Sequence, residues 1–497
     1  MIKVGFITNY FIFLFSKSKQ PPIRTLKKTV RWVIGIILGI YIGTIILLNI
    51  PYIQRNMTTF VTKELSRTLG TELTIGKIDI GLLNRIIIDD VLLDDQSGKE
   101  MLKITRLSAK FDIIPLFNGK ITISSVQLFG FNINLNKPAP HMEPNFKFVL
   151  DAFASKDTVK TKKDIDLRIN SILIRRGKLS YDVLSEEETP GKFNPQHIKL
   201  HNIIANISLK ALQNDSINAA IKRLSVDEQS GFELRKLSLK VIANNKGMKI
   251  ENFAIEMPGT EMKMDTIRME YDSLKALNHF ADNVRFSFRT LPSHVTLNDI
   301  SAFVPALSNF KEKLDLNIDV EGTLNQLNCR TLEINAGDKF RLKGDVSLQD
   351  LSRPQDAYVY GHLANLSANK EGIGFLVRNL SPHYNGVPPV LQHLGNTSFH
   401  GEISGYFTDL VMYGLFRTDI GSVQTDLKLS SDKAKALFSY SGGVKTTDFE
   451  LGQLLGNKQL GKITFNLDVR GNHYKSQYPS ITLKGLIASL EYLSLIH

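Results

Sequence analysis

The sequence predicts a mainly β protein, in which an N-terminal transmembrane helix is followed by an elongated, curved antiparallel β-sheet groove (a β-taco-like fold) with short helices. Three observations predict this class. Residues 32–50 contain no charged side chain. From Leu73 onward apolar and polar residues alternate with a period of two, as in strands. Turn-like connections such as Asn118-Gly119 suit antiparallel hairpins better than helical crossovers.

Residues 32–50 are predicted to be an uncleaved signal anchor. As a helix they extend roughly 28 Å, close to the ~30 Å thickness of a hydrocarbon core. Two lysines and an arginine lie just before the span, so the positive-inside rule keeps residues 1–31 in the cytoplasm and exports the rest of the chain. A buried helix of a globular domain is the alternative. The apolar stretch 4–15 is too short to span, and the role of residues 1–24 is left open.

Residues 51–154 are predicted to form an amphipathic helix and a first β-groove region. Apolar residues from Ile53 to Leu69, Phe60 among them, recur at helical spacing. Gly70 follows them and is typical of a helix C-cap. Strand patterns occupy the remainder of this region.

The rest of the chain is predicted to continue as strands. The charged, polar segment 155–164 is predicted to be a linker or long loop, and residues 165–290 form a second β-groove region. Residues 291–497 contain a degenerate repeat of a helix-like piece followed by an alternating strand, which we expect to stack into a continuous sheet and to continue in a longer protein. The helix-like pieces are residues 299–307, 371–380 and 449–455.

Composition excludes several classes of protein. The 497 residues carry a net charge of +12, but seven cations and no acid lie in residues 1–31, so the remainder is nearly balanced and nucleic acid is not an expected partner. The single cysteine, Cys329, excludes intramolecular disulfides, zinc ribbons and C-x-x-C redox centres.

No pattern of catalytic or metal-binding residues stands out. Gly456 to Lys462 has P-loop glycine and lysine spacing, but Ile463 replaces the required hydroxyl and a helical piece leads into a strand, the reverse of a P-loop. The aspartates at 89–90 and 94–95 lack the ligand spacing of a calcium loop, and the histidines lack zinc-site spacing. We therefore predict a protein that is not an enzyme and that uses no cofactor or metal.

The apolar rows of the strands are the candidate lipid-binding residues. An antiparallel sheet that curls without a covering layer offers acyl chains an apolar path through water. The same rows would equally be the core of ordinary β-sandwiches. The candidate groove-lining residues are Leu107, Phe111, Ile113, Phe129, Phe131, Ile133, Leu135, Leu237, Leu239, Val241, Ile463, Phe465, Leu467 and Val469.

The order of features in residues 27–137 resembles the N-terminal part of AsmA-like envelope proteins of the translocation and assembly module type. Those features are the basic-flanked span, the amphipathic helix to Gly70 and the strand series that begins LTIGKIDIG at Leu73. The later segment FELGQLLGNKQLGKITFNLDVRG, residues 449–471, is similar to a unit that recurs in that family. The resemblance implies a bacterial inner-membrane anchor and a long periplasmic β-groove.

The resemblance also implies two functions. One is movement of phospholipid between the inner and outer membranes. The other is assembly or secretion of outer-membrane proteins with a BamA-like barrel partner, which the family meets through a C-terminal domain that has no counterpart before His497. From the residues alone, strand pairing at an exposed sheet edge is a rival to lipid conduction. An anchored hydrolase would need a converging nucleophile and base.

Overall fold

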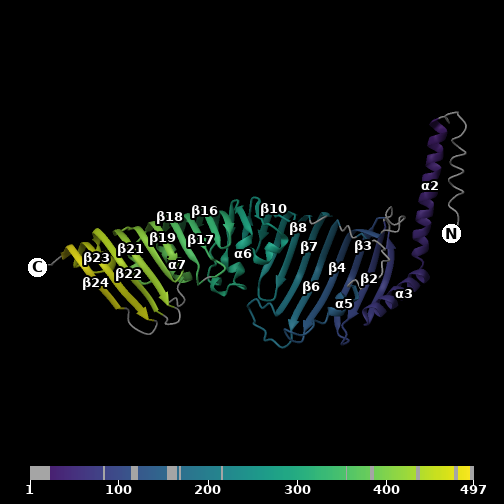
Figure 1. Cartoon of the computed structure of the whole chain (residues 1–497), viewed down its shortest axis with the longest axis horizontal. Coiled ribbons are helices and arrows are strands. Elements are labelled where there is room, and N and C mark those ends of the chain that lie inside the picture. Colours follow the sequence, from purple (N-terminus) through teal and green to yellow (C-terminus); the bar gives the residue numbers. More distant parts are fainter. Residues whose placement is uncertain are drawn as a thin grey trace.

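A computed structural model gives the fold of this chain (Figure 1). Ile113, the predicted linker 155–164 and the apolar stretch 4–15 lie outside the described residues. The residues that the structure describes are 23–81, 84–112, 121–153, 165–166, 170–213, 216–353, 355–380, 386–432, 437–474 and 480–492.

Two helices begin the described chain. Helix α2 (Ile23–Leu48) contains a stretch, Lys27–Leu48, that is long and apolar enough to cross a membrane and is not buried by the rest of the protein. Helix α3 (Pro51–Leu69) begins with Pro at its first turn and ends at Gly70, whose φ of 69° is the left-handed cap expected from the sequence. Of the apolar residues at helical spacing in this helix, Leu69 is buried whereas Phe60 is 69% exposed.

The strands lie side by side along the length of the molecule, and Figure 1 shows α2 projecting from the end that bears α3. The predicted mainly β class is confirmed, since the described strands join in one 24-stranded sheet. Their bounds are β1 Leu73–Gly81, β2 Arg85–Asp94, β3 Glu100–Phe111, β4 Ile121–Lys137, β5 Ile165–Asp166, β6 Ser171–Val183, β7 His197–Gln213, β8 Ser216–Glu228, β9 Glu233–Ala243, β10 Gly247–Glu256, β11 Glu261–Lys263, β12 Ile267–Glu270, β13 Arg285–Arg289, β14 Ser293–Val295, β15 Leu314–Thr323, β16 Gln326–Ala336, β17 Phe340–Gln349, β18 Tyr358–Ala368, β19 Thr397–Tyr406, β20 Asp409–Thr418, β21 Gly421–Asp432, β22 Leu437–Glu450, β23 Leu460–Tyr474 and β24 Ser480–Tyr492.

Neighbours in sequence are mostly neighbours in the sheet, and their pairing is antiparallel as predicted. The long strands β4 and β6 are an exception, because they pair in parallel from Ser125 with Ser171 to Lys137 with Val183. The sheet therefore continues across the segment predicted to be a linker. In the middle, β10 pairs with both β11 and β12, and β15 pairs with both β13 and β14.

Short helices lie along one end of the strands, which we call the helix rim. They connect β4 to the strands that follow it, β14 to β15, β18 to β19 and β22 to β23. Each packs apolar residues on the sheet; Ile373 and Phe375 of α7, for example, join Leu314 and Phe340 in a buried cluster. Of the helix-like pieces expected from the sequence, 371–380 is helical and 449–455 is helical from Leu451, whereas 299–307 contains parts of two separate 3-10 segments. These segments are α5 Lys147–Phe153, η2 Leu297–Ile300, η3 Pro305–Leu307, α7 Lys370–Leu380, α8 Pro389–Gln392 and α9 Leu451–Leu455.

The opposite ends of the strands form the turn rim, which carries the β1–β2 turn between Gly81 and Arg85. Two further helical segments, η1 (Leu274–His279) and α6 (Phe280–Asn283), connect β12 to β13 at this rim. The α2–α3 connection lies beside the same end of the sheet, because Asn49 Nδ2 donates a 2.8 Å hydrogen bond to the Ile80 carbonyl. The two rims of the sheet thus carry different structures.

A line of irregular residues crosses the first strands near their middle. Asp90, Gly130, Arg176 and Asn202 all have left-handed φ values, of 53°, 64°, 56° and 55°. Pairing is interrupted at this line; Ile104 and Arg106 of β3, for instance, pair with Phe131 and Phe129 of β4, so Thr105 and Gly130 are both left out of the ladder and the register is unchanged. The alternation of side chains between the two faces is interrupted at the same line, since Phe131 is 6% exposed and Phe129 is 37% exposed.

Candidate functional site: the apolar face of the sheet

The two faces of the sheet differ in chemistry. On β15, Leu316 and Val320 point to one face, and on β16 their partners Ile334 and Cys329 do the same, because side chains of directly paired residues share a face. The opposite face carries ion pairs such as Lys343 with Glu333 (2.7 Å) and Arg289 with Asp319 (2.7 Å). We call these the apolar face and the polar face.

Unbroken rows of apolar residues follow the register from strand to strand. Near α3, one row crosses β1 to β11 and contains Ile78, Ile88, Leu107, Leu128, Ile174, Ala205, Leu224, Leu237, Ile255 and Met262. At the other end, one row crosses β15 to β24 and contains Leu316, Ile334, Leu342, Leu366, Phe399, Phe416, Val423, Thr446, Phe465 and Ile487. Between them a shorter row, nearer the opposite ends of the strands, contains Ala243, Met248, Met269 and Phe286 and ends at Gly322 of β15.

Most of the predicted lining residues lie on the apolar face. Leu107 and Phe111 of β3 pair with Leu128 and Ile123, and Ile133 of β4 pairs with Leu102. Leu135 packs in the buried cluster beneath α3 and α5. The further residues that the register places on this face are Phe131, Leu237, Leu239, Val241, Ile463, Phe465, Leu467 and Val469.

Phe129 does not share this face, so its assignment to the apolar row is wrong. It pairs directly with Arg106, which forms a 2.6 Å ion pair with Asp89 on the polar face. The Arg176 guanidinium lies over the Phe129 ring, 5.1 Å from its centroid. The physical reason is the left-handed backbone at Gly130, where the ladder is interrupted and the regular alternation between Phe129 and Phe131 is lost.

Aromatic rings on the apolar face cover glycines of neighbouring strands. A Cβ added to Gly177 would lie 2.3 Å from Cζ of Phe131, and one added to Gly471 would lie 2.3 Å from Cζ of Tyr440. The Phe399 ring covers Gly414 of the neighbouring β20, with 2.8 Å from its Cζ to an added Cβ, and also Gly401 of its own strand, with 2.9 Å. The rings therefore lie flat against bare backbone, which keeps the face smooth. Sequence reasoning missed this arrangement, although Gly within a strand is its signal.

Helix α3 seals the first edge of the sheet. Thr58 Oγ1 accepts a 3.2 Å hydrogen bond from the Ile78 N–H, and Ser66 Oγ accepts one of 3.1 Å from the Leu73 N–H. These side chains satisfy backbone groups of β1 that would otherwise be an open edge. By contrast every residue of β24, at the other edge, is exposed, including Leu486 (66%).

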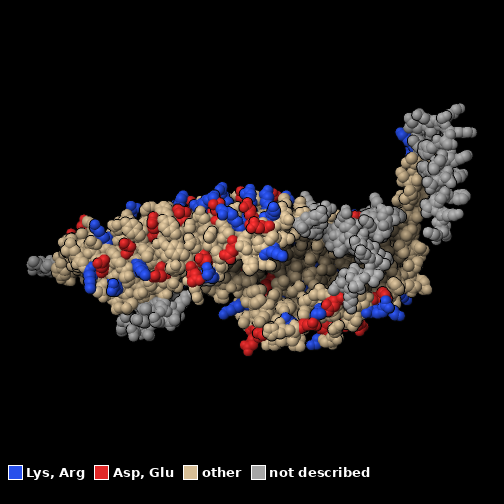
Figure 2. All heavy atoms as spheres, in the orientation of Figure 1, with Lys and Arg blue, Asp and Glu red and all other residues tan. Residues whose placement is uncertain are grey.

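The molecular surface is hollowed over the half of the sheet nearer α2. Figure 2 shows this hollow with few charged side chains in its wall, whereas charged side chains are scattered over the surface toward β24. The buried cluster beneath α3 and α5 lies at the helix rim of this half.

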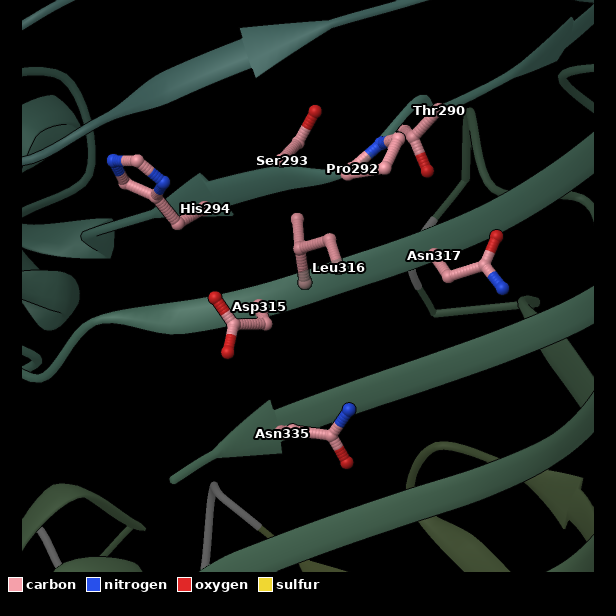
Figure 3. Close-up of a pocket in the computed structure, with 8 residues that line it drawn as sticks. All are labelled: Thr290, Pro292, Ser293, His294, Asp315, Leu316, Asn317 and Asn335. Carbon is pink, nitrogen blue, oxygen red and sulfur yellow. The ribbon is translucent and has the colours of Figure 1, made fainter.

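A pocket of about 470 Å³ opens over β14 to β16, and Figure 3 shows its lining side chains. Asp315, Asn317 and Asn335 lie on neighbouring strands, with His294 at one end. In Figure 3 these polar groups are spread along the strands and do not converge on one point. The pocket lacks the mutual geometry of a nucleophile and its base.

One cluster within the described residues has the composition of a metal site: Asp182, Glu188 and His197. His197 Nδ1 lies 3.0 Å from Asp182 Oδ1, and its Nε2 lies 3.0 Å from the Glu186 carbonyl. Both partners are acceptors, an arrangement that suits an imidazolium donating from both ring nitrogens. The hydrogen bond that the imidazole donates to Asp182 raises the pKa of His197. The contacts of both ring nitrogens tie the end of β6 to the start of β7, which gives this cluster a structural role.

The other candidate motifs have structural roles. The P-loop-like segment is the end of α9, where Gly456 has a φ of 67°, followed by β23. Asp95 Oδ1 accepts hydrogen bonds from the backbone N–H groups of Ser97 and Lys99, which closes the β2–β3 turn. Burial raises the pKa of the Cys329 thiol, which keeps it protonated and unreactive.

Comparisons with models of protein families, with curated proteins and with solved structures find no match to this chain. The apolar face, defined by its rows of directly paired side chains, is therefore the candidate functional site on the strength of its geometry.

Proposed function

We propose that this chain is a membrane-anchored β-groove protein of the bacterial cell envelope, without enzymatic activity, that moves phospholipid between the inner and outer membranes. In this function α2 spans the inner membrane with the N-terminus in the cytoplasm and the sheet in the periplasm. The observation that carries the proposal is the apolar face, on which one row of directly paired side chains runs from β1 to β11 and another from β15 to β24.

The chemistry of a phospholipid suits this surface. Acyl chains gain ~0.8 kcal/mol for each CH₂ group removed from water, and a strip of apolar side chains across many strands offers that burial without a specific pocket. Lipid head groups must stay in contact with water, and the hollowed surface in Figure 2 is open to solvent. Rings laid over Gly177 and Gly401 avoid ridges that would stop a chain from sliding.

The test is photo-crosslinking in intact cells, with mass spectrometry for attached lipid. We would place the probe at Leu128, Val241 and Phe465, which lie on the apolar face near the start, at one third and near the end of the sheet. Phe131 is a poorer position because it is only 6% exposed. Phospholipid adducts are expected at all three positions.

Matched controls carry the probe on the polar face of the same strands, at Gln127, Ser238 and Asn466. These positions should give no adducts. Equal labelling of the two faces, or labelling of neither in a folded and exported protein, would contradict lipid conduction.

A second candidate function is a TamB-like assembly module that aids outer-membrane protein insertion or secretion with a BamA-like partner. Strand β24 favours it, because among the described residues it pairs with β23 alone and exposes Ile487 and Tyr492, and an exposed strand of this kind can pair with an incoming one. Proline substitutions along β24 should abolish such pairing and leave lipid adducts at Leu128 unchanged. Aspartate at Val241 should have the reverse effect.

A further inference from the structure

The turn rim next to α2 has features that the proposed conduction of lipid does not by itself require. The hydroxyl of Tyr41, within the apolar stretch of α2, donates a 3.3 Å hydrogen bond to Oδ1 of Asn84 in the β1–β2 turn. Asn49, just beyond α2, donates to the Ile80 carbonyl at 2.8 Å. Two contacts, made by residues eight positions apart, thus fix the end of the first hairpin against α2 and the residue that follows it.

The first of these contacts sets the depth of the hairpin. Tyr41 lies seven residues before the end of α2 at Leu48, which corresponds to ~10 Å along the helix axis. The apolar stretch Lys27–Leu48 is ~33 Å long and so fills a hydrocarbon core of ~30 Å. When α2 crosses a bilayer, the hairpin end at Asn84 therefore reaches below the surface of the leaflet on the sheet side.

Two cations lie at the same end of the sheet. Arg85 of β2 and Lys110 of β3 are direct cross-strand partners, an arrangement that places like charges side by side. Across the described part of the chain, neither has a carboxylate within ion-pair distance, and the Arg85 guanidinium reaches only the Gln127 side-chain oxygen, at 3.5 Å. An anion between them would relieve the repulsion, and long cationic side chains near a membrane surface extend to the phosphate layer.

We infer that the turn rim at Gly81–Arg85 is seated in the leaflet beside α2, where Arg85 and Lys110 bind phospholipid phosphate and the apolar face opens directly to acyl chains. The partner is the glycerophospholipid of that leaflet. The inference rests on the proposed function only for its last part, the uptake of acyl chains.

Insertion of the turn rim into the membrane is tested by measuring how deeply a fluorophore attached at this rim lies in the bilayer. The full chain carrying Cys329→Ala is reconstituted in vesicles of phosphatidylcholine with phosphatidylglycerol, and an environment-sensitive dye is attached to Asp112→Cys or to Glu100→Cys. Asp112 follows the last residue of β3 at the turn rim, and Glu100 begins the same strand ~40 Å away. Both native residues are acidic, so the two variants are matched in charge.

Lipids with a quencher on the acyl chain should quench the dye at position 112 several-fold more strongly than the dye at position 100. Equal quenching at the two positions would contradict insertion of the turn rim into the membrane. Arg85→Gln/Lys110→Gln should remove the extra quenching that phosphatidylglycerol gives over phosphatidylcholine alone. The control Lys103→Gln/Lys178→Gln also removes two cations from the polar face, and it should leave the extra quenching by phosphatidylglycerol unchanged. A loss in both pairs, or in neither, would overturn the phosphate contact.

Failure of this inference and failure of the proposed function give different results. Lipid adducts at Leu128, Val241 and Phe465 with an unquenched dye at position 112 would mean that lipid arrives by another route. Strong quenching without adducts would mean that the rim is seated in the membrane but that the apolar face does not conduct.

Discussion

Replacing Gly177 with alanine should loosen the contact between β4 and β6. The added Cβ would lie 2.3 Å from Cζ and 2.5 Å from Cε1 of Phe131, and 3.0 Å from Cβ of Ile203. The first two distances are far below van der Waals contact, so the Phe131 ring has to leave its position over the backbone. This ring is 6% exposed, and its displacement opens the apolar face at the one place where two long strands pair in parallel.

The expected cost is that of overpacking a filled site, ~1–3 kcal/mol. Amides of β4 and β6 that open locally should then exchange roughly 5- to 150-fold faster, which hydrogen–deuterium exchange of the purified protein measures peptide by peptide. Strands far from the site, such as β20, should exchange as in the unsubstituted protein. The effect is local because each strand contacts only its neighbours.

Gly443→Ala is the matched control, since a Cβ at Gly443 meets nothing within 4 Å. It should leave exchange in β22 unchanged or slow it, because alanine restricts the unfolded chain by up to about 1 kcal/mol. Phe131→Leu combined with Gly177→Ala should recover part of the loss. If the amides of β4 and β6 in Gly177→Ala exchange no faster than in the unsubstituted protein, as expected for β22 in Gly443→Ala, then the Phe131 ring does not rest on Gly177 and the reasoning is refuted.

Two further predictions concern pH and the sealed edge. The pKa of His197 is raised in the folded state, so its stabilising ion pair is fully present below the ordinary histidine pKa of about 6.5 and is lost as pH rises through the raised value. Amide hydrogens where β6 meets β7 should therefore exchange faster as pH rises, by more than the intrinsic pH dependence of amide exchange accounts for. The substitution Asp182→Asn should abolish this additional increase. Thr58→Val removes the acceptor for the buried Ile78 N–H and should cost ~1–3 kcal/mol, seen as faster exchange at Ile78, whereas Thr59→Val on the exposed side of α3 should change little. Unaltered exchange at Ile78 would show that the cap does not stabilise the edge.

The alternation of apolar residues predicted the strands and their faces wherever a strand is regular. Leu237 to Val241 and Ile463 to Val469 each share one face because the extra residues of the register shifts beside them lie on the neighbouring strands, so β9 and β23 themselves alternate regularly. Periodicity fails where the ladder is interrupted within a strand, because the regular alternation between the faces is lost there. Gly130, a glycine within a strand pattern, was the available signal at Phe129.

Tertiary features were beyond the reach of local patterns. The parallel pairing of β4 with β6 depends on how residues 138–170 return the chain, and neither strand differs in composition from an antiparallel one. The side of α3 that meets β1 contains Gln54 and Thr58, which periodicity assigns to solvent. They are buried because the sheet edge needs hydrogen-bond partners, and only the assembled edge reveals that need.

The sealed edge at β1 determines the order in which the sheet can form during synthesis. Almost every strand pairs with the one before it, and β1 is closed by α3, which precedes it in the chain. The sheet can therefore grow from β1 toward β24, each new strand adding to the free edge as it is synthesised. Until the next strand is made, the exposed edge belongs to the most recently synthesised strand, which is the part of the growing sheet most prone to pair with another chain.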